Sequence, residues 1–274
     1  MRTLSSRRRN AIVLTILAGA AISLYLWAYS MRLAASSYVS GWILLCIMLV
    51  LMSYNLRKKL PFLPLLKSST WLQIHIYLGF LSILLFLQHT SFGLIPNGTL
   101  ESMLAALYWL VAGSGIVGLF LTRTLPGRLS VRGEELLFER MPIYRRNIHE
   151  EAERLVLAAV EEAGTTTLAD YYQRRLANYF NGFRNFWHHL IESKRPRHNL
   201  ETELSDLDRY LSDREREIAS DLQELVFVKD DLDYQHALQK TLKGWLFIHI
   251  AFTYSLMIVA LVHVVVVHAF KGGL

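Results

Sequence analysis

The chain contains almost no cysteine. Its 274 residues include one, Cys46, which lies inside an apolar run. A single cysteine excludes an internal disulfide, a four-cysteine iron–sulfur site and covalent haem attachment through Cys-x-x-Cys-His. A haem in this chain could therefore be held only by histidine. Residues 123–242 also contain no Gly-rich phosphate loop, no dinucleotide fingerprint and no internal repeat.

Acidic residues are almost absent outside one segment. Residues 123–242 hold 22 of the 23 acidic residues and 18 of the 29 basic residues, which gives this segment a net charge of −4. The rest of the chain has eleven basic residues and one acid, Glu101, for a net charge of +10. Those basic residues cluster at the ends of apolar runs, where they orient membrane helices and meet anionic headgroups. The high pI therefore belongs to the predicted membrane part and reflects its topology. Membrane lipid is an expected partner, and nucleic acid is not.

Five apolar runs are long enough to cross a membrane as helices. They cover roughly residues 11–29, 39–56, 71–90, 102–122 and 245–270. Basic clusters at Arg7–Arg9 and Arg57–Lys59 place the start of the first run and the end of the second in the cytoplasm. We expect Pro126 and Gly127 to end the fourth run. The runs predict an all-α, polytopic protein of the plasma (bacterial inner) membrane, with its N-terminus in the cytoplasm and its C-terminus outside.

A cleaved signal peptide is the alternative for the first run. Arg7–Arg9 could form its basic region, and LAAS at Leu33–Ser36 is a passable cleavage site. The apolar run is longer than the usual apolar core of a signal peptide. We therefore expect the run to be retained as a membrane helix.

The charged segment is predicted to be a helical cytoplasmic domain inserted between the fourth and fifth membrane helices. The expected domains are 1–122 with four membrane helices, 123–242 with the insertion, and 243–274 with the fifth membrane helix and a short outer tail. Leucines at spacings of three and four over residues 201–228 predict one amphipathic helix there. Seven aromatic residues are expected to form the core of this domain, with a docking surface as the alternative: Tyr171, Tyr172, Tyr179, Phe180, Phe183, Phe186 and Trp187.

Two of the apolar runs carry a pair of histidines each. His75 and His89 lie fourteen residues apart in the third run, and His249 and His263 lie fourteen apart in the fifth. On an α-helix, fourteen residues turn through about 1400°, some 40° short of four full turns, and rise about 21 Å. Each helix therefore shows both imidazoles on one face, one near each membrane surface.

Both of these runs are predicted to cross from inside to outside, so that their histidines match in depth. A histidine in hydrocarbon is costly and usually faces a partner, a cavity or a metal. Haem iron accepts two neutral imidazoles, one on each face. We expect two haem b groups, one held by His75 and His249 near the cytoplasmic side and one held by His89 and His263 near the outer side.

His268 competes with His263 for the outer site. It lies nineteen residues from His249, which is about 100° around the helix, whereas His263 is about 40° away. We therefore expect His268 at the outer interface, in contact with solvent, a haem propionate or a quinone head. Five further histidines fall in the inserted segment, and we expect surface or core roles for them rather than metal binding: His149, His188, His189, His198 and His236.

Small and basic residues near the ligands are predicted to complete the haem sites. Gly79 and Ser82 would line the face between the ligands of the third run. Gly115 lies in the small-residue sequence AGSGIVG, which either packs closely against another helix or makes room for a porphyrin. Propionates need cations at the membrane surfaces. The candidates are Arg123 and Lys243 inside and Arg32 and Lys271 outside.

The two histidine pairs resemble the bis-histidine ligands of transmembrane dihaem cytochromes b. Their place on the third and fifth runs is most similar to the transmembrane domain of the ferric reductase and NADPH oxidase superfamily, over residues 71–122 and 244–270. The quinol-oxidising cytochrome b group has similar spacing. The resemblance implies electron transfer across the membrane, from a cytoplasmic or quinol donor to an acceptor outside, with redox partner proteins on one or both sides.

The chain also departs from that superfamily. It has five predicted spans where the superfamily core commonly has six, it carries the insertion of residues 123–242, and the usual flavin and nicotinamide domain does not follow the last span. We therefore expect an electron-transfer subunit of a larger redox system, a hetero-oligomer, rather than a complete enzyme. A quinone is a further candidate cofactor.

Two other functions fit the same histidines. A proton or metal transporter would use them as a relay, which predicts further polar residues along the same runs. Such residues are nearly absent there. A membrane sensor or scaffold would use them only for packing, and this function predicts no cofactor.

Overall fold

The chain is helical throughout the part that the computed structural model describes. The described residues are 4–31, 36–59, 67–130, 136–164 and 166–270. Within these ranges there is no strand, and five helices are long and apolar enough to cross a membrane. The prediction of an all-α, multi-pass membrane protein is confirmed at this level. Arg32, residues 33–35 of the LAAS sequence, and the tail 271–274 with Lys271 lie outside the described residues.

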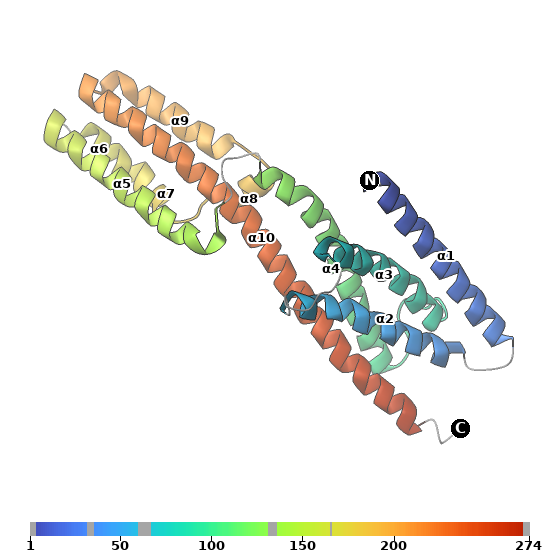
Figure 1. Cartoon of the computed structure of the whole chain (residues 1–274). Helices are drawn as coiled ribbons and strands as arrows, with labels where there is room; N and C mark the ends of the chain where they lie inside the picture. Colours follow the sequence, from blue (N-terminus) through green and yellow to red (C-terminus); the bar gives the residue numbers. More distant parts are fainter. Residues whose placement is uncertain (1–3, 32–35, 60–66, 131–135, 165, 271–274) are drawn as a thin grey trace. The chain divides into compact units, whose positions relative to one another are not determined.

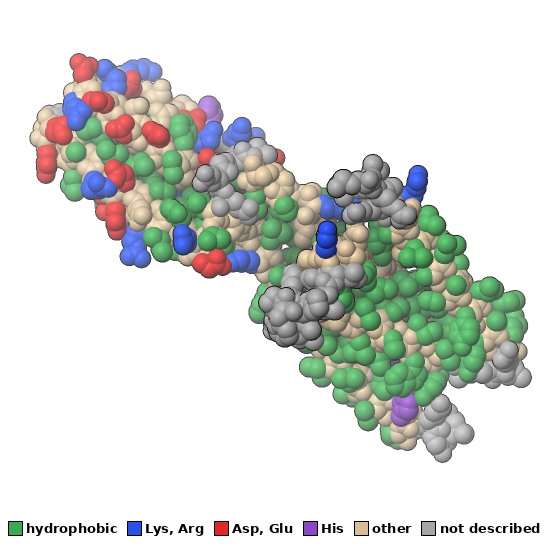
Figure 2. All heavy atoms as spheres, viewed as in Figure 1, with side chains coloured by type: hydrophobic (Ala, Val, Ile, Leu, Met, Phe, Trp, Pro, Cys, Tyr) green, Lys and Arg blue, Asp and Glu red, His purple; other side chains and the backbone are tan. Residues whose placement is uncertain are grey.

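The helices form two compact units. The first comprises Met1–Leu119 and Leu246–Leu274, and the second comprises Phe120–Trp245. These divisions lie close to the domain boundaries that we expected at residues 123 and 242. Figure 2 shows apolar side chains gathered over the helices of the first unit and charged side chains over those of the second. This segregation is the one expected when the first unit faces lipid and the second faces water.

The first unit contains the candidate membrane spans (Figure 1). They are α1 (Leu4–Ser30), α2 (Ser36–Lys59), α3 (Ser68–His89), most of α4 (Thr99–Leu129) and the last part of α10 (Asp213–Phe270). An α-helix pairs the backbone N–H and C=O groups within its own segment. The hydrocarbon core of a membrane requires this, because it holds no water to bond to them. Phe86 of α3 stacks on Tyr108 of α4 with ring centroids 4.0 Å apart. These rings lie in a core shared by all five spans.

α4 continues through Pro126 and Gly127, so our prediction that these residues end it is wrong. Proline inside a helix removes one backbone hydrogen bond and costs about 3 kcal/mol. Leu125 and Leu129 flank this point, and both are buried against α10. Their burial within the second unit holds the turn in helical form, because tertiary packing overrides a local helix breaker.

The last span is not a separate helix. α10 is continuous from Asp213 to Phe270, so the predicted start near Trp245 is wrong. Gly244 is a weak breaker, since one glycine costs a helix only about 1 kcal/mol. The rise in hydropathy near Trp245 marks the beginning of the apolar part of the helix and not the beginning of the helix.

The second unit is a bundle of shorter helices around the first part of α10. Its elements are η1 (Phe138–Arg140), α5 (Met141–Ala163), α6 (Thr167–Tyr171), η2 (Tyr172–Leu176), α7 (Ala177–Phe180), α8 (Phe186–Leu190), α9 (Arg195–Leu207) and η3 (Asp208–Tyr210). The single helix predicted over residues 201–228 is wrong, because the chain breaks before α10. Ser212 and Glu215 form a capping box there: the Ser212 N–H donates to Glu215 Oε2 at 3.0 Å, and the Glu215 N–H donates to Ser212 Oγ at 3.3 Å.

Three of the seven aromatic residues lie in the buried core of this unit. Tyr172, Tyr179 and Phe180 are buried in it, which confirms the core interpretation for them. Phe183 stacks on His236 of α10 with ring centroids 3.6 Å apart. Trp187 is different, because 72% of it is exposed.

We expect His236 to make the second unit sensitive to acid. Burial, and then the neighbouring Lys240 and Lys229, lower the pKa of His236 from 6.5 to about 4. As the pH falls below 6.5 the unfolded chain takes up a proton at this position and the folded chain does not. The stability contributed by His236 is therefore present above pH 6.5 and is lost as the pH falls toward 4. His236→Phe keeps an aromatic ring in the stack and removes this loss.

Thermal melting of the full chain in detergent between pH 7 and pH 4 measures the effect. The melting temperature of the wild type will fall more steeply over this range than that of His236→Phe. Equal slopes for the two proteins would contradict the role of this histidine.

Candidate functional site

His75 of α3 and His249 of α10 lie together in the first unit. Their ring centroids are 6.4 Å apart, and the ring planes make an angle of 75°. Two imidazoles that bind one metal ion through nitrogen–metal bonds of about 2 Å have ring centroids roughly 6 Å apart. The centroid spacing of the first predicted histidine pair is therefore compatible with a shared metal ion.

Each of these two imidazoles has its Nδ1 atom engaged by another helix. The Nδ1 of His75 lies 3.1 Å from the carbonyl oxygen of Leu51 on α2. The Nδ1 of His249 lies 2.7 Å from the Oγ of Ser114 on α4. A hydrogen bond at Nδ1 fixes the tautomer and the ring orientation of a histidine that binds metal through Nε2. The ring orientation of both side chains is therefore held by a neighbouring helix.

His89 and His263 form the second predicted pair. The Nδ1 of His89 lies 3.0 Å from the carbonyl oxygen of Ser37 and 3.2 Å from the Oγ of Ser40, both on α2. The two imidazoles lie within electrostatic range of each other. No hydrogen bond or ring contact joins them within the described part of the chain. The structure thus brings them into the same region without the ring contact of the first pair.

The imidazole of His263 has a buried Nδ1 atom that no described side chain or backbone group satisfies. Leaving a buried polar atom without a hydrogen bond costs about 1–3 kcal/mol. A haem bound beside this histidine would remove this cost if one of its polar substituents formed a hydrogen bond with Nδ1. The second pair is therefore the less complete of the two sites.

The contacts of the four histidines show that α3 and α10 run in the same direction, as predicted. The first histidine of α3 meets the first of the α10 span, and the second of α3 is near the second. Fourteen helical residues separate the two levels by about 21 Å. The two sites therefore lie at two depths of one helix bundle.

Glycines lie beside the imidazoles on neighbouring helices. A Cβ built on Gly41 of α2 would lie 3.0 Å from Cε1 of His89, which is closer than side chains normally approach. A Cβ on Gly115 would lie 3.8 Å from Cε1 of His249, an ordinary contact, and one on Gly79 would meet nothing within 4 Å. Gly41 thus makes room for His89, and Gly79 leaves open space one turn after His75.

The remaining predicted site residues have other contacts. The Oγ of buried Ser82 is 2.9 Å from the hydroxyl of Tyr108, so it joins α3 to α4. Arg123 is exposed. The Nζ of Lys243 lies 2.5 Å from Oε1 of Glu139 and 4.1 Å from the ring centroid of Phe138. Both basic residues belong to the second unit, and their pairing with propionates stays a prediction.

His268 has both ring nitrogens engaged. Its Nε2 lies 2.8 Å from the hydroxyl of Tyr38, and its Nδ1 lies 2.8 Å from the carbonyl oxygen of Val264. Its ring also meets Trp42 edge-on with centroids 5.7 Å apart. His268 therefore joins α10 to α2 and offers no nitrogen to an iron.

The histidines of the second unit do not gather into a site. His188 is exposed, whereas His189 is buried with its Nε2 3.9 Å from Oδ1 of Asp230, so the two point in different directions. Over the described ranges, no group of three or more His, Cys, Asp or Glu side chains is arranged to hold a bare metal ion. The contact between two predicted ligands is that of His75 with His249 in the first unit.

Sequence reasoning missed the neighbours of His89 and His249. Ser40 and Gly41 of α2 contact His89, and nothing in the sequence of α2 marked them. Ser114 was visible only as part of a small-residue sequence, and its hydrogen bond to His249 was not predicted.

Comparisons of the chain with protein-family models, with curated proteins and with solved structures found no match.

Proposed function

We propose that this chain is a membrane-embedded dihaem b-type cytochrome that moves electrons between a cytoplasmic or quinol donor and an acceptor on the outer side. The observation that carries the proposal is the 6.4 Å separation of the His75 and His249 rings. The two imidazoles come from different helices, and each has its Nδ1 atom engaged by a neighbouring helix. This is an arrangement in which one iron could bind both rings.

The side chains of this chain hold and orient the cofactors. His75 and His249 would ligate one iron, and His89 and His263 the other. Leu51 and Ser114 keep the first two imidazoles in one orientation through Nδ1. When bound, two haems at two depths supply one-electron carriers along the path between the membrane surfaces.

The charge pattern supports the direction of this path. The basic residues at the start of α1 and the end of α2 belong on the cytoplasmic side of a plasma membrane by the positive-inside rule. α3 and the apolar part of α10 then both run outward. His75 and His249 lie toward the cytoplasm, and His89 and His263 lie toward the outside.

Electron transfer by reconstituted protein tests the function. Purified full chain is placed in lipid vesicles that enclose ferricyanide, and dithionite is added outside. Vesicles with wild-type protein will bleach the enclosed ferricyanide faster than empty vesicles, and His263→Leu will abolish the difference. If haem-loaded wild-type protein gives the same rate as empty vesicles, electron transfer across the membrane is contradicted.

Gly41 gives a prediction for the outer site alone. Gly41→Val places atoms against the ring of His89, whose Cε1 is already 3.0 Å from an added Cβ. We expect the haem content of this variant to fall from two per chain to about one. Gly113→Val is the matched control, because a Cβ at Gly113 meets nothing within 4 Å. Equal haem content in the two variants, measured after alkaline pyridine extraction, would show that Gly41 does not protect a ligand.

A further inference from the structure

The end of α4 that belongs to the second unit is bonded to the short helix α8. The guanidinium of Arg128 donates to the carbonyl oxygens of His189 and Leu190, each at 2.9 Å. Its Nε also lies 2.6 Å from Oε1 of Glu192. The side chain of Leu190 packs against buried residues of α4 and α10. Figure 1 shows α8 beside this end of α4. α8 is therefore attached to the last turn of a candidate membrane span.

This attachment puts α8 at the level of lipid headgroups. The apolar sequence of α4 ends at Arg123, and Arg128 follows five residues later, after about 7.5 Å of helix. The headgroup region on each side of a bilayer is about 5–8 Å thick. α10 has a similar attachment just before its apolar part begins at Trp245, because Lys243 forms an ion pair with Glu139 of η1. The second unit is thus fastened to both helices where their apolar sequences end.

α8 and the residue after it expose two large apolar side chains at this level. Trp187 and Ile191 are 72% and 74% exposed. Leaving such side chains in water costs free energy that burial against apolar groups would recover. Tryptophan is enriched at the membrane–water interface, where its ring meets acyl chains and its N–H meets polar groups. The two side chains therefore suit the headgroup level of a membrane better than they suit water.

Basic residues flank these two side chains in the sequence. Residues 184–197 contain four basic residues and one acid, for a net charge of +3, although the whole of residues 123–242 carries −4. The acid, Glu192, is paired with Arg128. Lys194 and Arg195 are exposed, and neither forms an ion pair with a carboxylate in the part of the chain that the structure describes. Anionic headgroups attract basic residues that lie near a membrane surface.

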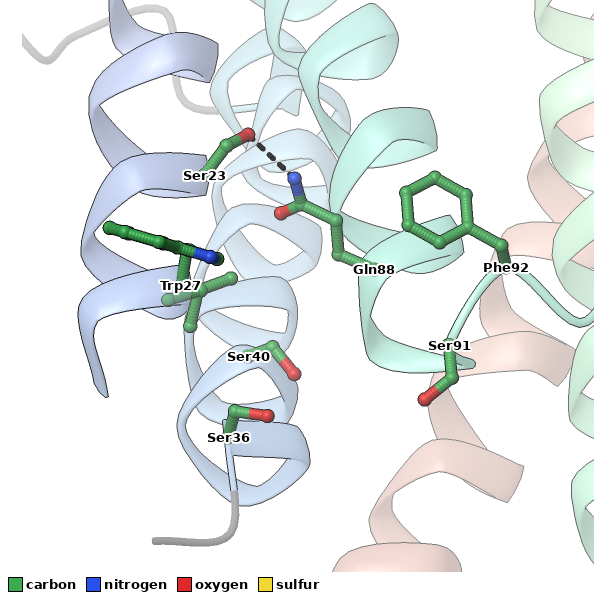
Figure 3. Close-up of a pocket in the computed structure, with 8 residues that line it drawn as sticks. Ser23, Trp27, Ser36, Ser40, Gln88, Ser91 and Phe92 are labelled. Carbon is green, nitrogen blue, oxygen red and sulfur yellow. Dashed lines mark hydrogen bonds between the residues drawn. The ribbon is translucent and has the colours of Figure 1, made fainter. Parts of the chain in front are cut away.

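Trp27 of α1 provides a comparison, because it is an exposed tryptophan near the end of a span without such cations. It is 59% exposed and lines a pocket of the first unit together with four serines, Leu26, Gln88 and Phe92 (Figure 3). None of the described residues that line this pocket is charged. Trp27 therefore has surroundings that suit neutral and anionic lipid equally, whereas the surroundings of Trp187 favour anionic lipid.

We propose that Trp187, Ile191, Lys194 and Arg195 form a lipid-binding surface of the second unit, and that its ligand is anionic phospholipid. The two apolar side chains lie among the headgroups and the upper acyl chains, and the two cations pair with lipid phosphates. The surface extends the lipid contact of the α4 span into a unit that is otherwise acidic. It needs the membrane spans and does not need haem, so it goes beyond the cytochrome function and can fail separately from it.

Quenching of a fluorophore by headgroup-labelled lipid tests the proposal. The full chain with Cys46→Ser, which removes its natural cysteine, receives a single labelling site by Ile191→Cys. It is placed in nanodiscs of phosphatidylcholine alone, or of equal parts phosphatidylcholine and phosphatidylglycerol, each with a small share of phosphatidylcholine that carries a nitroxide on its headgroup. We expect the nitroxide to quench the fluorophore, and to do so more strongly in the discs with phosphatidylglycerol.

Two other labelling sites serve as controls. Tyr210→Cys places the fluorophore on η3, at a residue that is also 74% exposed. From the start of α10 beside it, at Asp213, the helix runs about 45 Å before it reaches Lys243. We expect almost no quenching there in either disc. Trp27→Cys places the fluorophore at the end of a span without cations, and we expect equal quenching in the two discs.

Neutral variants test the two cations. Lys194→Gln and Arg195→Gln will each weaken the association of the Ile191→Cys position with phosphatidylglycerol about fivefold, seen as a higher share of this lipid at half-maximal quenching. Arg209→Gln is the matched control, because it removes an exposed cation next to Tyr210, and its quenching curve will not shift.

Three results overturn the lipid-binding surface. The first is quenching at Ile191→Cys no stronger than at Tyr210→Cys, which would leave a partner protein as the occupant of the exposed apolar side chains. The second is equal quenching at Ile191→Cys in the two kinds of disc. The third is an equal shift of the quenching curve in Lys194→Gln, Arg195→Gln and Arg209→Gln, which would reflect the net charge of the chain. The haem content of the samples bears on the cytochrome alone.

Discussion

Replacing His249 with leucine will lower the haem content of the purified chain from two haems to one. His249 is one of two imidazoles whose rings lie 6.4 Å apart, so its loss leaves His75 without its partner on the iron. His89 and His263 lie about 21 Å away along their helices and are untouched by the change. The haem-to-protein ratio and the reduced absorption spectrum measure the loss.

His268→Leu is the control for this experiment. It removes a histidine from the same helix, but one whose nitrogens are engaged by Tyr38 and Val264. Both haems will remain in this variant. Ser114→Ala removes the hydrogen bond to Nδ1 of His249, and the affinity for the inner haem will fall about 10- to 100-fold. Retention of two haems by His249→Leu would show that the pairing is wrong.

Replacing Lys229 with methionine will destabilise the second unit by about 3–5 kcal/mol, because it leaves a buried carboxylate without its cation. Lys229 and Asp233 are both fully buried, and the Nζ lies 2.6 Å from each carboxylate oxygen. The Nζ also donates to the carbonyl oxygen of Gly182 at 2.8 Å. The free energy of unfolding of the full chain in detergent, followed by tryptophan fluorescence in urea, measures the change.

The double variant Lys229→Met, Asp233→Leu will recover most of that loss, since no buried charge is left. An exposed pair gives the matched control. Arg154 and Glu151 form an ion pair at the surface of α5, and Arg154→Met will cost less than about 1 kcal/mol. A loss of less than 1 kcal/mol in Lys229→Met would show that the buried pair contributes little to the stability of this unit.

The class of fold could be predicted from the sequence because apolar runs of membrane length leave few choices. Residues 71–89 and 245–270 are helical, as expected from their length and hydropathy. The ends of the helices could not be predicted in the same way. α4 passes through Pro126 because Leu125 and Leu129 are packed, and α10 passes through Gly244 because its penalty is small. Packing of this kind depends on residues far away in the chain.

The candidate site could be predicted in part. The fourteen-residue spacing placed two imidazoles on one face of each helix, and the meeting of His75 with His249 follows from that spacing and from parallel helices. The residues around them could not be predicted, because one sequence does not show which faces of α2 and α4 turn toward them. Gly41 against His89 and Ser114 against His249 became visible only in three dimensions.

The reduced-minus-oxidised absorption spectrum of the purified full chain, taken together with its haem-to-protein ratio, tests the cytochrome proposal most directly. Two histidine pairs at two depths predict the spectrum of low-spin b-type haem and a ratio close to two. A colourless preparation, obtained from cells that are supplied with haem, would contradict the assignment of His75, His89, His249 and His263 as axial ligands.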